Sequence, residues 1–304
     1  MTRIVAVVVL YHPEPQAMRR SLESWLAQVD AMVCVDNGGC ASLRADIEAL
    51  APGRVTLVDM GGNAGLGAAH NRGVSVARGL AATHVLLADQ DSRPNDGMVA
   101  ELVRVEAAAL AAGHDVSAVG PRCIDPRTGR DTPFVRCGPL RYHYLREAPP
   151  GGWVVTDLLI SSGSLIRMSV LDAVGPMDET LFIDQVDIEW CLRANASGRD
   201  AIGAFQATMT HQLGDRMIVI KLGRIRRIPV HKSFRYYFMF RNSVSLYRRD
   251  YAPMSWVVPD VMRLGKLVFY FGLIDSARLQ NLAMMWRGLV DGLRGVTGPG
   301  PLAR

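Results

Sequence analysis

The first 125 residues alternate short apolar, β-branched runs with segments of helical spacing, and this alternation constrains the fold most. The apolar runs are residues 3–12, 31–39, 54–63, 84–89 and 116–121. The helical segments between them are residues 17–28, 68–80 and 98–112. Runs that are apolar throughout are typical of parallel strands covered on both faces, with the helices as right-handed crossovers. The alternation therefore predicts an α/β fold with a doubly wound, mostly parallel central sheet.

The rest of the chain is patterned less regularly. Residues 125–152 are rich in Pro, Gly, Arg and Tyr without a clear period, which favours an irregular insertion near a site. A helix is expected to end at Gly198, and the chain beyond Lys232 has helical spacing with Pro253 and Pro259 as breaks. The Gly/Pro-rich tail from Gly295 predicts a frayed end. We therefore expect a helical C-terminal extension after the sheet domain.

The net charge of +5 is concentrated in one segment. Residues 216–249 hold ten Lys/Arg and no Asp/Glu, so the rest of the chain sums to −5. Such a segment suits a polyanion or an anionic membrane surface, or forms a solvated basic face without a partner. Interleaved aromatic residues could indicate RNA, but no nucleic-acid module accompanies them and the acidic remainder disfavours this interpretation. We expect no nucleic-acid partner.

Hydropathy and cysteine placement bear on the compartment. No apolar run approaches the roughly 20 residues that a membrane-spanning helix needs, and nothing before Ile4 has the pattern of a signal peptide. The five cysteines are scattered without a CxxC pair, which argues against a disulfide framework and a zinc site. We expect a cytoplasmic protein without a spanning helix, in which residues 216–304 form a basic, mostly helical region at the inner face of the cell membrane.

Polar residues gather where the predicted strands end. Asp36, Asn63 and Asp89 lie at or just beyond the carboxyl ends of three apolar runs, where open parallel sheets bind their ligands. Asp89 and Asp91 are two residues apart as an extended segment stops, so their oxygens can point to one side. A hard divalent cation, Mg²⁺ or Mn²⁺, relieves their repulsion and takes its other ligands from water and phosphates. An isolated Asp-x-Asp is more often a solvated turn, and its position here predicts a metal–diphosphate site instead.

A glycine-rich motif precedes the fourth run. Residues 61–73 read GGNAGLGAAHNRG, which supplies glycines where backbone approaches a ligand and then opens a helix whose N-terminus favours anions. A dinucleotide fingerprint would need a third glycine where His70 stands, and would follow the first strand rather than the third. The motif therefore favours a phosphate-containing ligand other than a nicotinamide cofactor.

Taken in order, these motifs resemble a known family. The motifs are VVVLYHPE, VDNGG, GGNAGLGAAHNRG, LLADQDS, SSGSLIRMSVLDAVGPMDETLFIDQVDIEWCLRA and HQLGD, which together span about residues 4–215. The chain resembles family 2 glycosyltransferases, and particularly bacterial dTDP-rhamnosyltransferases. The resemblance implies a single nucleotide-binding domain of the A-type glycosyltransferase fold over residues 1–215, followed by the C-terminal region 216–304.

The resemblance also implies roles for individual residues. Asp36 matches the aspartate that contacts the nucleotide base. Asn63 and the glycine-rich motif match another part of the donor pocket, to which we assign Gly65, Gly67 and Asn71. The metal–diphosphate motif is matched by Asp89 and Asp91, of which Asp91 is the metal-contacting member, and His211 falls where some members place a further metal or diphosphate contact.

The catalytic base is expected in the stretch FIDQVDIEW. Asp187 stands at the position of the family's base, but the acidic residue that usually precedes it is Val186 here. Asp184 lies one helical turn earlier and is a competitor for the role. Glu189 and Arg193 are spaced i,i+4, so a salt bridge on a helix face is an alternative role for Glu189.

These roles imply an inverting transfer of a single sugar, because the spanning helices and the QxxRW motif of the processive synthases are absent from the sequence. The resemblance suggests dTDP-β-L-rhamnose as donor. It suggests a polyprenyl-diphosphate-linked or saccharide acceptor in the assembly of an O-antigen-like surface polysaccharide. Three alternatives stay open at this point: a different nucleotide-sugar donor, a nucleotidyltransferase acting on sugar phosphates, and a non-catalytic nucleotide- or lipid-binding scaffold.

Overall fold

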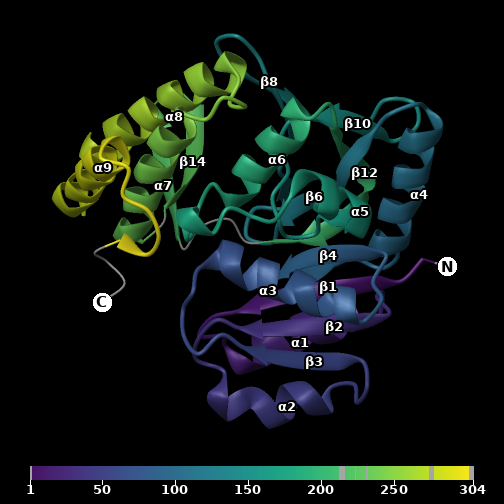
Figure 1. Ribbon diagram of the computed structural model, residues 1–304. Coiled ribbons are helices and arrows are strands. Elements are labelled where there is room, and N and C mark those ends of the chain that lie inside the picture. Colours follow the sequence, from purple (N-terminus) through teal and green to yellow (C-terminus); the bar gives the residue numbers. More distant parts are fainter. Residues whose placement is uncertain (1, 212–215, 223, 231, 274–276, 301–304) are drawn as a thin grey trace.

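The computed structural model describes residues 2–211, 216–222, 224–230, 232–273 and 277–300 (Figure 1). Its centre is a ten-stranded sheet whose main path runs β10-β12-β6-β11-β4-β1-β2-β3. The strands of this path are β1 (Ile4–Leu10), β2 (Ala31–Asp36), β3 (Val55–Asp59), β4 (His84–Asp89), β6 (Val116–Asp125), β10 (Trp153–Thr156), β11 (Leu165–Arg167) and β12 (Asp200–Thr210). Two short strands extend it, β5 (Arg93–Pro94) beside β12 and β7 (Arg130–Asp131) beside β6.

The sheet combines a parallel part with antiparallel additions. All five predicted apolar runs form strands, and β1 pairs in parallel with β2 and β4, as β2 does with β3. β12 is parallel to β6, whereas β11 is antiparallel to β4 and β6, and β10 is antiparallel to β12. The doubly wound parallel prediction is therefore confirmed for the N-terminal half, and the sheet becomes mixed where β11 inserts between β4 and β6.

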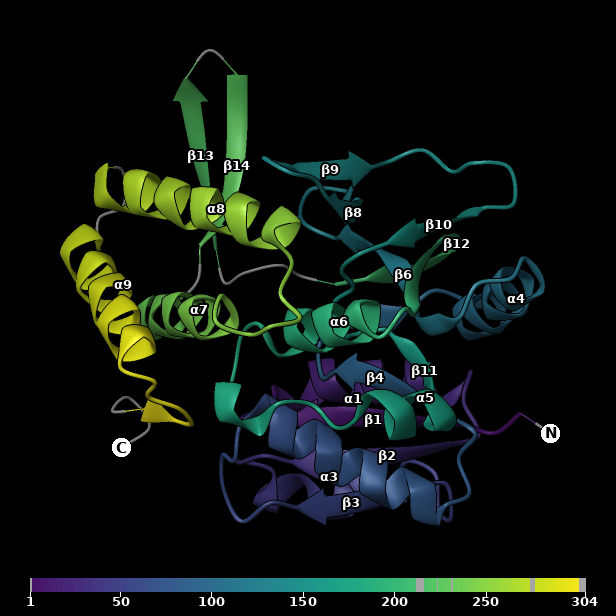
Figure 2. The ribbon, with the colours of Figure 1, turned by 45° about the horizontal axis from the view of Figure 1, so that its top comes forward.

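Helices cover both faces of the sheet (Figures 1 and 2). They are α1 (Pro15–Leu26), α2 (Arg44–Ala49), α3 (Leu66–Gly79), α4 (Met98–Ala111), α5 (Met168–Val174) and α6 (Val186–Ala196), with one-turn 3₁₀ helices η1 (Ala41–Leu43) and η2 (Glu179–Leu181). Because side chains alternate along a strand, Val5 and Val7 of β1 join a core with α3 and α6, whereas Ala6 and Val8 join a core with α1 and α4. β1 and β2 are therefore buried on both faces, as the all-apolar runs predict, whereas β3 at the edge of the sheet is only partly buried.

The prediction of an irregular insertion over residues 125–152 is wrong in part. This segment holds β7 and an antiparallel hairpin of β8 (Phe134–Cys137) and β9 (Tyr142–Leu145). The hairpin packs against the sheet domain through Phe134, which is buried and meets Phe205 edge to face. Its strands are only four residues long, and this is too short for an alternating pattern to stand out from the sequence.

The C-terminal region begins with a second hairpin, β13 (Arg216–Leu222) and β14 (Arg224–Val230), and continues as helices α7 (Ser233–Leu246), α8 (Met254–Leu273) and α9 (Arg278–Leu293). Pro253 precedes α8 as predicted, but Pro259 lies inside that helix and does not break it. The proposed boundary at residue 215 falls next to residues 212–215, outside the described part. No described helix is both long and apolar enough to cross a bilayer.

The tail is held in place rather than frayed at the positions that the structure describes. The backbone N–H of Gly298 donates to the Thr180 carbonyl at 2.7 Å, and the Gly298 carbonyl accepts from the buried guanidinium of Arg241. Residues 301–304 lie outside the described part. Composition alone suggested fraying, because it does not reveal these two distant partners.

Candidate active site

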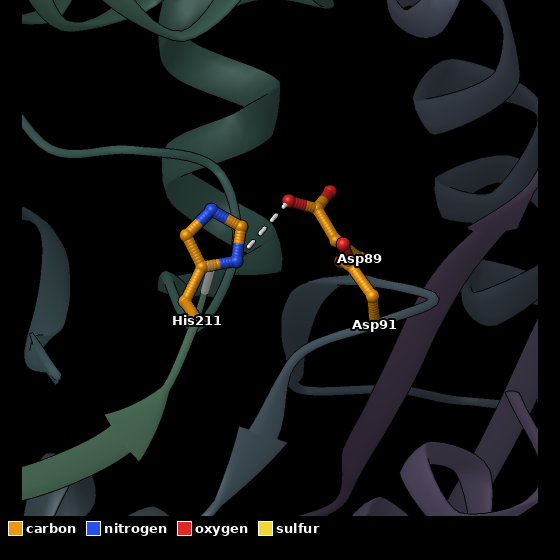
Figure 3. Close-up of side chains that lie close together, drawn as sticks. All are labelled: Asp89, Asp91 and His211. Atoms are coloured by element: carbon orange, nitrogen blue, oxygen red, sulfur yellow. Dashed lines mark ion pairs between the residues drawn. The ribbon is translucent and has the colours of Figure 1, made fainter. Parts of the chain in front are cut away.

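Asp89, Asp91 and His211 converge at the carboxyl end of β4 (Figure 3). Asp89 is the last residue of β4, Asp91 follows in the turn, and His211 comes directly after β12. The short ladder between β5 and β12 brings this turn to His211. One ligand atom from each of the three side chains lies within 4.8 Å of the others. The structure thus brings together the three residues assigned to the metal–diphosphate motif.

Two serines that the sequence analysis missed support this cluster. Ser92 Oγ and His211 Nδ1 are 2.6 Å apart, and Ser162 Oγ donates to Ser92 Oγ at 2.9 Å. The backbone N–H of Asp89 donates to Ser162 Oγ at 3.1 Å. Both serines stand inside motifs already noted, LLADQDS and SSGS. They are buried, and their hydroxyls supply hydrogen-bond partners to His211 and to the Asp89 N–H that apolar side chains could not supply.

Electrostatics at the cluster favour a cation. Burial raises the pKa of Asp89, and nearby Asp91 raises it further, whereas His211 and Arg235 act to lower that pKa. His211 Nδ1 lies 4.0 Å from an Asp89 carboxylate oxygen. Two carboxylates and an imidazole are a donor set that Mg²⁺ or Mn²⁺ accepts, so the residues present fit a divalent ion.

The residues assigned to the donor pocket include Asp36 at the end of β2 and Asn63 in the turn after β3. Asp36 is buried, and its Oδ1 accepts from the Gly38 N–H at 2.8 Å. Asn63 Oδ1 accepts from the Gly65 N–H at 3.1 Å and from Asn37 Nδ2 at 3.2 Å. Asn37 is a further polar residue that the sequence analysis did not single out, although it stands in the VDNGG motif. The bond between Asn37 and Asn63 connects the turn after β2 to the turn after β3, at the carboxyl edge of the sheet.

Gly65, Gly67 and Asn71 share contacts with the segment 177–182. Gly65 has a φ of +92°, and a Cβ there would lie 2.8 Å from the Phe182 carbonyl oxygen. A Cβ on Gly67 would approach the Asp178 carbonyl to 3.0 Å. Asn71 exchanges hydrogen bonds with the Met177 backbone, accepting at 2.9 Å and donating at 3.0 Å. The structure thus uses these residues to join α3 to the segment before α6, and their assignment to donor binding stays a prediction.

Asp187 lies in the first turn of α6, on the wall of a cavity. Its Oδ1 accepts from the Ile188 N–H at 2.9 Å. Burial raises the pKa of Asp187 to about 6, with nearby Asp184 acting in the same direction and the Ile188 bond against it. The residue lines a cavity of about 140 Å³ whose walls are mostly apolar, among them Phe134 and Leu158. A carboxylate whose pKa lies this close to neutrality, beside a cavity, is suited to accept a proton.

Asp184 differs from Asp187 because it has a cationic partner. Arg235 of α7 donates to the Asp184 carboxylate from Nε at 3.2 Å and from Nη2 at 2.5 Å. The Asp184 side chain is only 8% exposed. Asp184 is thus held by Arg235, whereas Asp187 lines the cavity, so the geometry favours Asp187 as the candidate base.

The segment of residues 182–185, just before α6, has a strained backbone and is hydrogen-bonded to residues of α7. Phe182, Asp184 and Gln185 all have φ between +62° and +65°, a region that costs non-glycine residues about 1–3 kcal/mol each. Asn242 Nδ2, which is buried, lies within 3.0 Å of the carbonyls of residues 181, 183 and 184. Arg241 adds a bond to the Leu181 carbonyl at 2.8 Å. Surrounding structure of this kind is what keeps a strained backbone in place at a functional site.

Glu189 has a structural role. It is 1% exposed, pairs with Arg193 at 2.7 Å, and accepts from the Tyr251 hydroxyl at 2.7 Å. The i,i+4 salt bridge is therefore confirmed. Glu189 is directed to the packing of α6 rather than to the cavity beside Asp187.

Comparison with known proteins decides the family. Residues 6–175 match the profile described as glycosyl transferase family 2. The chain belongs to this family. This chain is 30% identical over 309 residues to the dTDP-rhamnosyl transferase RfbF of Shigella flexneri, with 98% of each chain covered. It is 28% identical to the galactofuranosyltransferase GlfT1 of Mycobacterium tuberculosis over 80% of this chain and 81% of that one.

Solved structures confirm the predicted A-type fold. TarS of S. aureus (residues 1–349, in complex with UDP-GlcNAc) superposes with a TM-score of 0.60 at 15% identity, covering 97% of this chain and 82% of that one. GalNAc-T7 with UDP, GalNAc and Mn²⁺ gives a TM-score of 0.58 at 12% identity, covering 87% of this chain and 54% of that one. The family profile and the likeness to RfbF show that this chain is a glycosyltransferase, and the nucleotidyltransferase and scaffold alternatives are set aside.

Proposed function

We propose that this glycosyltransferase is an inverting rhamnosyltransferase that uses dTDP-rhamnose and adds a single sugar per acceptor. The likeness to RfbF over nearly the whole chain supports the donor. The observation that carries the mechanism is the division of the carboxylates into two sets. Asp89 and Asp91 gather with His211, whereas Asp187 stands apart on the wall of a cavity.

In this proposal the donor diphosphate lies beside Asp89, Asp91 and His211, which would together hold Mg²⁺ or Mn²⁺. A divalent ion bound there supplies positive charge that stabilises the departing diphosphate. The polar turn at Asp36 and Asn63 receives the nucleoside. Asp187 accepts the proton of the acceptor hydroxyl as that oxygen attacks the anomeric carbon from the side opposite the diphosphate. The bond to the diphosphate breaks and the configuration of the sugar inverts.

The acceptor is proposed to bind in the cavity beside Asp187. The cavity walls come from β6, β8, the loop between β10 and β11, and the first turn of α6, and they include Pro121, Val135 and Ile188. Mostly apolar walls suit the carbon face of a saccharide ring. We propose an acceptor that is a saccharide or a polyprenyl-diphosphate-linked saccharide in the assembly of an O-antigen-like polysaccharide, used at the inner face of the membrane.

A donor panel tests this proposal directly. Purified protein is incubated with dTDP-rhamnose, UDP-GlcNAc, GDP-mannose and nucleotide-activated galactofuranose, each with Mg²⁺, Mn²⁺ or EDTA. Release of the nucleoside diphosphate is measured, with water taking the place of the acceptor hydroxyl. The galactofuranose donor is included because of the likeness to GlfT1. Release of dTDP from dTDP-rhamnose well above every other donor is expected. Turnover of another donor with dTDP-rhamnose left intact would refute the assignment of the sugar while leaving the base and metal residues in place.

A further inference from the structure

The exposed apolar side chains of the described residues are concentrated on two helices. Thirteen large apolar residues are exposed, and eight of these lie on α8 and α9. The eight are Met254, Val261, Met262, Val268, Phe269, Leu279, Trp286 and Leu293. Scattered exposed apolar residues are normal, but a cluster of this size on neighbouring elements marks an interaction surface. We call these eight side chains the α8–α9 outer surface.

The spacing of these residues places them in stripes. Leu279, Trp286 and Leu293 are seven residues apart, and so are Met254, Val261 and Val268, with Met262 and Phe269 beside the latter stripe. Seven residues are close to two full helical turns, so each set lies on one side of its helix. Leu279 is 78% exposed and Trp286 is 67% exposed, so both side chains lie largely in solvent.

The opposite side of α9 is packed against α7. A Cβ on Gly288 would lie 2.3 Å from the Tyr237 carbonyl oxygen, and one on Gly292 would lie 2.7 Å from that of Arg241. At 100° per residue, the stripe of Leu279, Trp286 and Leu293 lies about 140° around the helix from this packed side. The apolar stripe therefore faces outward because the inner side of α9 is already occupied.

On α8 and α9, basic side chains are exposed, whereas the acidic side chains are hydrogen-bonded within the protein. The basic residues Lys266, Arg278 and Arg287 are exposed, as is Arg294 directly after α9. The acidic residues are Asp260 of α8 and Asp291 of α9. Asp260 is 1% exposed and accepts from Arg263 and Tyr247, and Asp291 accepts from the Tyr237 hydroxyl. Among the described residues of α8 and α9, the exposed charged groups are therefore all positive.

We infer that the α8–α9 outer surface lies on an anionic lipid bilayer without crossing it. Apolar side chains flanked by Arg and Lys fit the boundary between acyl chains and acidic headgroups, where Trp is also favoured. A second copy of this chain fits less well, because a symmetric contact between two such surfaces would bring like charges together. The aromatic residues Tyr236, Tyr237 and Phe238 of α7 add nothing to this surface, because they are buried.

The position of this surface fits a membrane-linked acceptor. Helices α8 and α9 lie at the end of the molecule away from β1–β3, and β8 lies beside α8 (Figures 1 and 2). The β8–β9 hairpin exposes Leu140 in its turn and Tyr144, and its Phe134 and Val135 line the cavity that contains Asp187. The inference deepens the proposed function by naming the face that binds the membrane. The link between this face and a lipid-linked acceptor rests on the proposed function, whereas the membrane contact itself does not.

Vesicle sedimentation with the full-length protein tests the inference without requiring turnover. Vesicles of phosphatidylcholine alone are compared with vesicles that also contain phosphatidylglycerol. The variants are Leu279→Ser/Trp286→Ser/Leu293→Ser for the apolar stripe and Arg287→Ser/Arg294→Ser for the charges. Leu110→Ser on α4 is the matched control, because Leu110 is also exposed but lies on a different helix. The melting temperature of each variant is measured alongside, so that misfolded protein is not scored as non-binding.

The wild type and Leu110→Ser should bind the anionic vesicles preferentially, and added salt should weaken this binding. Each Arg near an anionic surface contributes about fivefold, so the double Arg variant should bind about 25-fold more weakly. The apolar triple variant should lose at least about tenfold, because burying even one Leu side chain is worth that much. Brominated lipids should quench the fluorescence of wild-type protein more than that of Trp286→Phe.

Wild-type binding by a folded apolar triple variant would overturn the inference. A dimer of the wild type that the triple variant converts to a monomer, with no vesicle binding by either, would identify a second copy as the occupant. In both cases the donor panel would be unaffected, so failure of the membrane surface is distinguishable from failure of the proposed transferase activity.

Discussion

Replacement of Asp187 by Asn separates the activity of this enzyme from its stability. The pKa of Asp187 rises from 3.8 to about 6 because the side chain is buried. A raised pKa means that the folded state binds the proton more tightly than the unfolded state, so the ionised carboxylate destabilises the fold. The stabilising contribution of the protonated form is complete below pH 4 and is lost as pH rises through about 6.

The size of the destabilisation by ionised Asp187 follows from the change in its pKa. About two pKa units correspond to about 3 kcal/mol, which is the upper limit for the destabilisation by ionised Asp187 at pH 8. Asp187→Asn stays neutral and can keep the bond from the Ile188 N–H. The variant should therefore unfold at higher denaturant concentration than the wild type at pH 8, and the difference should shrink toward zero at pH 4. Urea unfolding at both pH values measures this directly.

The activity of Asp187→Asn should fall, although its stability at pH 8 should rise. Loss of a general base typically costs about 10²–10⁴ in rate, so Asp187→Asn should turn over very slowly while still binding dTDP with metal. In the wild type, turnover should fall as pH drops through about 6, with about one tenth of the base ionised at pH 5.

Asp184→Asn is the matched control for this experiment. This substitution removes a nearby negative charge that raises the pKa of Asp187. The variant should therefore stay active, and the fall of its turnover at acidic pH should occur at lower pH than in the wild type. An inactive Asp184→Asn beside a fully active Asp187→Asn would show that the two roles are reversed. An Asp187→Asn variant that is both inactive and less stable at pH 8 would refute the electrostatic reasoning.

Three further perturbations probe the rest of the site. Removal of metal by EDTA should abolish transfer, Mg²⁺ or Mn²⁺ should restore it, and Asp91→Ala should stay folded and nearly inactive; full turnover in EDTA would contradict the metal assignment. Gly65→Ala should lower the melting temperature and weaken dTDP binding measured by calorimetry, because φ is +92° and the new Cβ would meet Phe182; unchanged values would mean that the turn relaxes freely. Asn242→Ala leaves buried carbonyls without a donor and should cost about 1–3 kcal/mol of stability. The same variant should lower kcat more than it raises KM for the donor, and a change in KM alone would argue against positioning of the base.

The parallel half of the fold and the metal cluster could be predicted from sequence for the same reason. Apolar runs identify the strands, and in a parallel sheet the residues at their carboxyl ends meet at one edge. Asp36, Asn63 and Asp89 follow this rule closely. His211 was placed by the resemblance alone, because β12 reaches the cluster through a two-residue ladder with β5 that no periodic pattern reveals.

The strained segment before α6 was not predictable from its own residues. Positive φ at Phe182 and Gln185 contradicts local preference, since aromatic and amide side chains seldom adopt it. The conformation is maintained by Asn242 and Arg241, which lie about 60 residues later in the chain. Local rules fail here because the cost is offset by buried hydrogen bonds that arise only after α7 has packed. Residues of α7, which the predicted boundary at 215 assigns to a separate region, thereby shape the proposed catalytic segment.

The choice between Asp184 and Asp187 illustrates the same limit at the level of charge. Both carboxylates stand in one short motif, and spacing alone left them as competitors for the base. What separates them is Arg235, whose guanidinium pairs with Asp184. Asp187 lines the cavity instead, and its charge is opposed by burial and by Asp184. Because a base needs access to its substrate, we expect Asp187 to hold the role, whereas Asp184 is excluded both by its pairing with Arg235 and by its place outside the cavity lining. Arg235→Gln should then free Asp184 without restoring activity to Asp187→Asn, because Asp184 would still be held on the strained segment and outside the cavity lining. Recovery of turnover in that double variant would show that charge, and not position, had excluded Asp184.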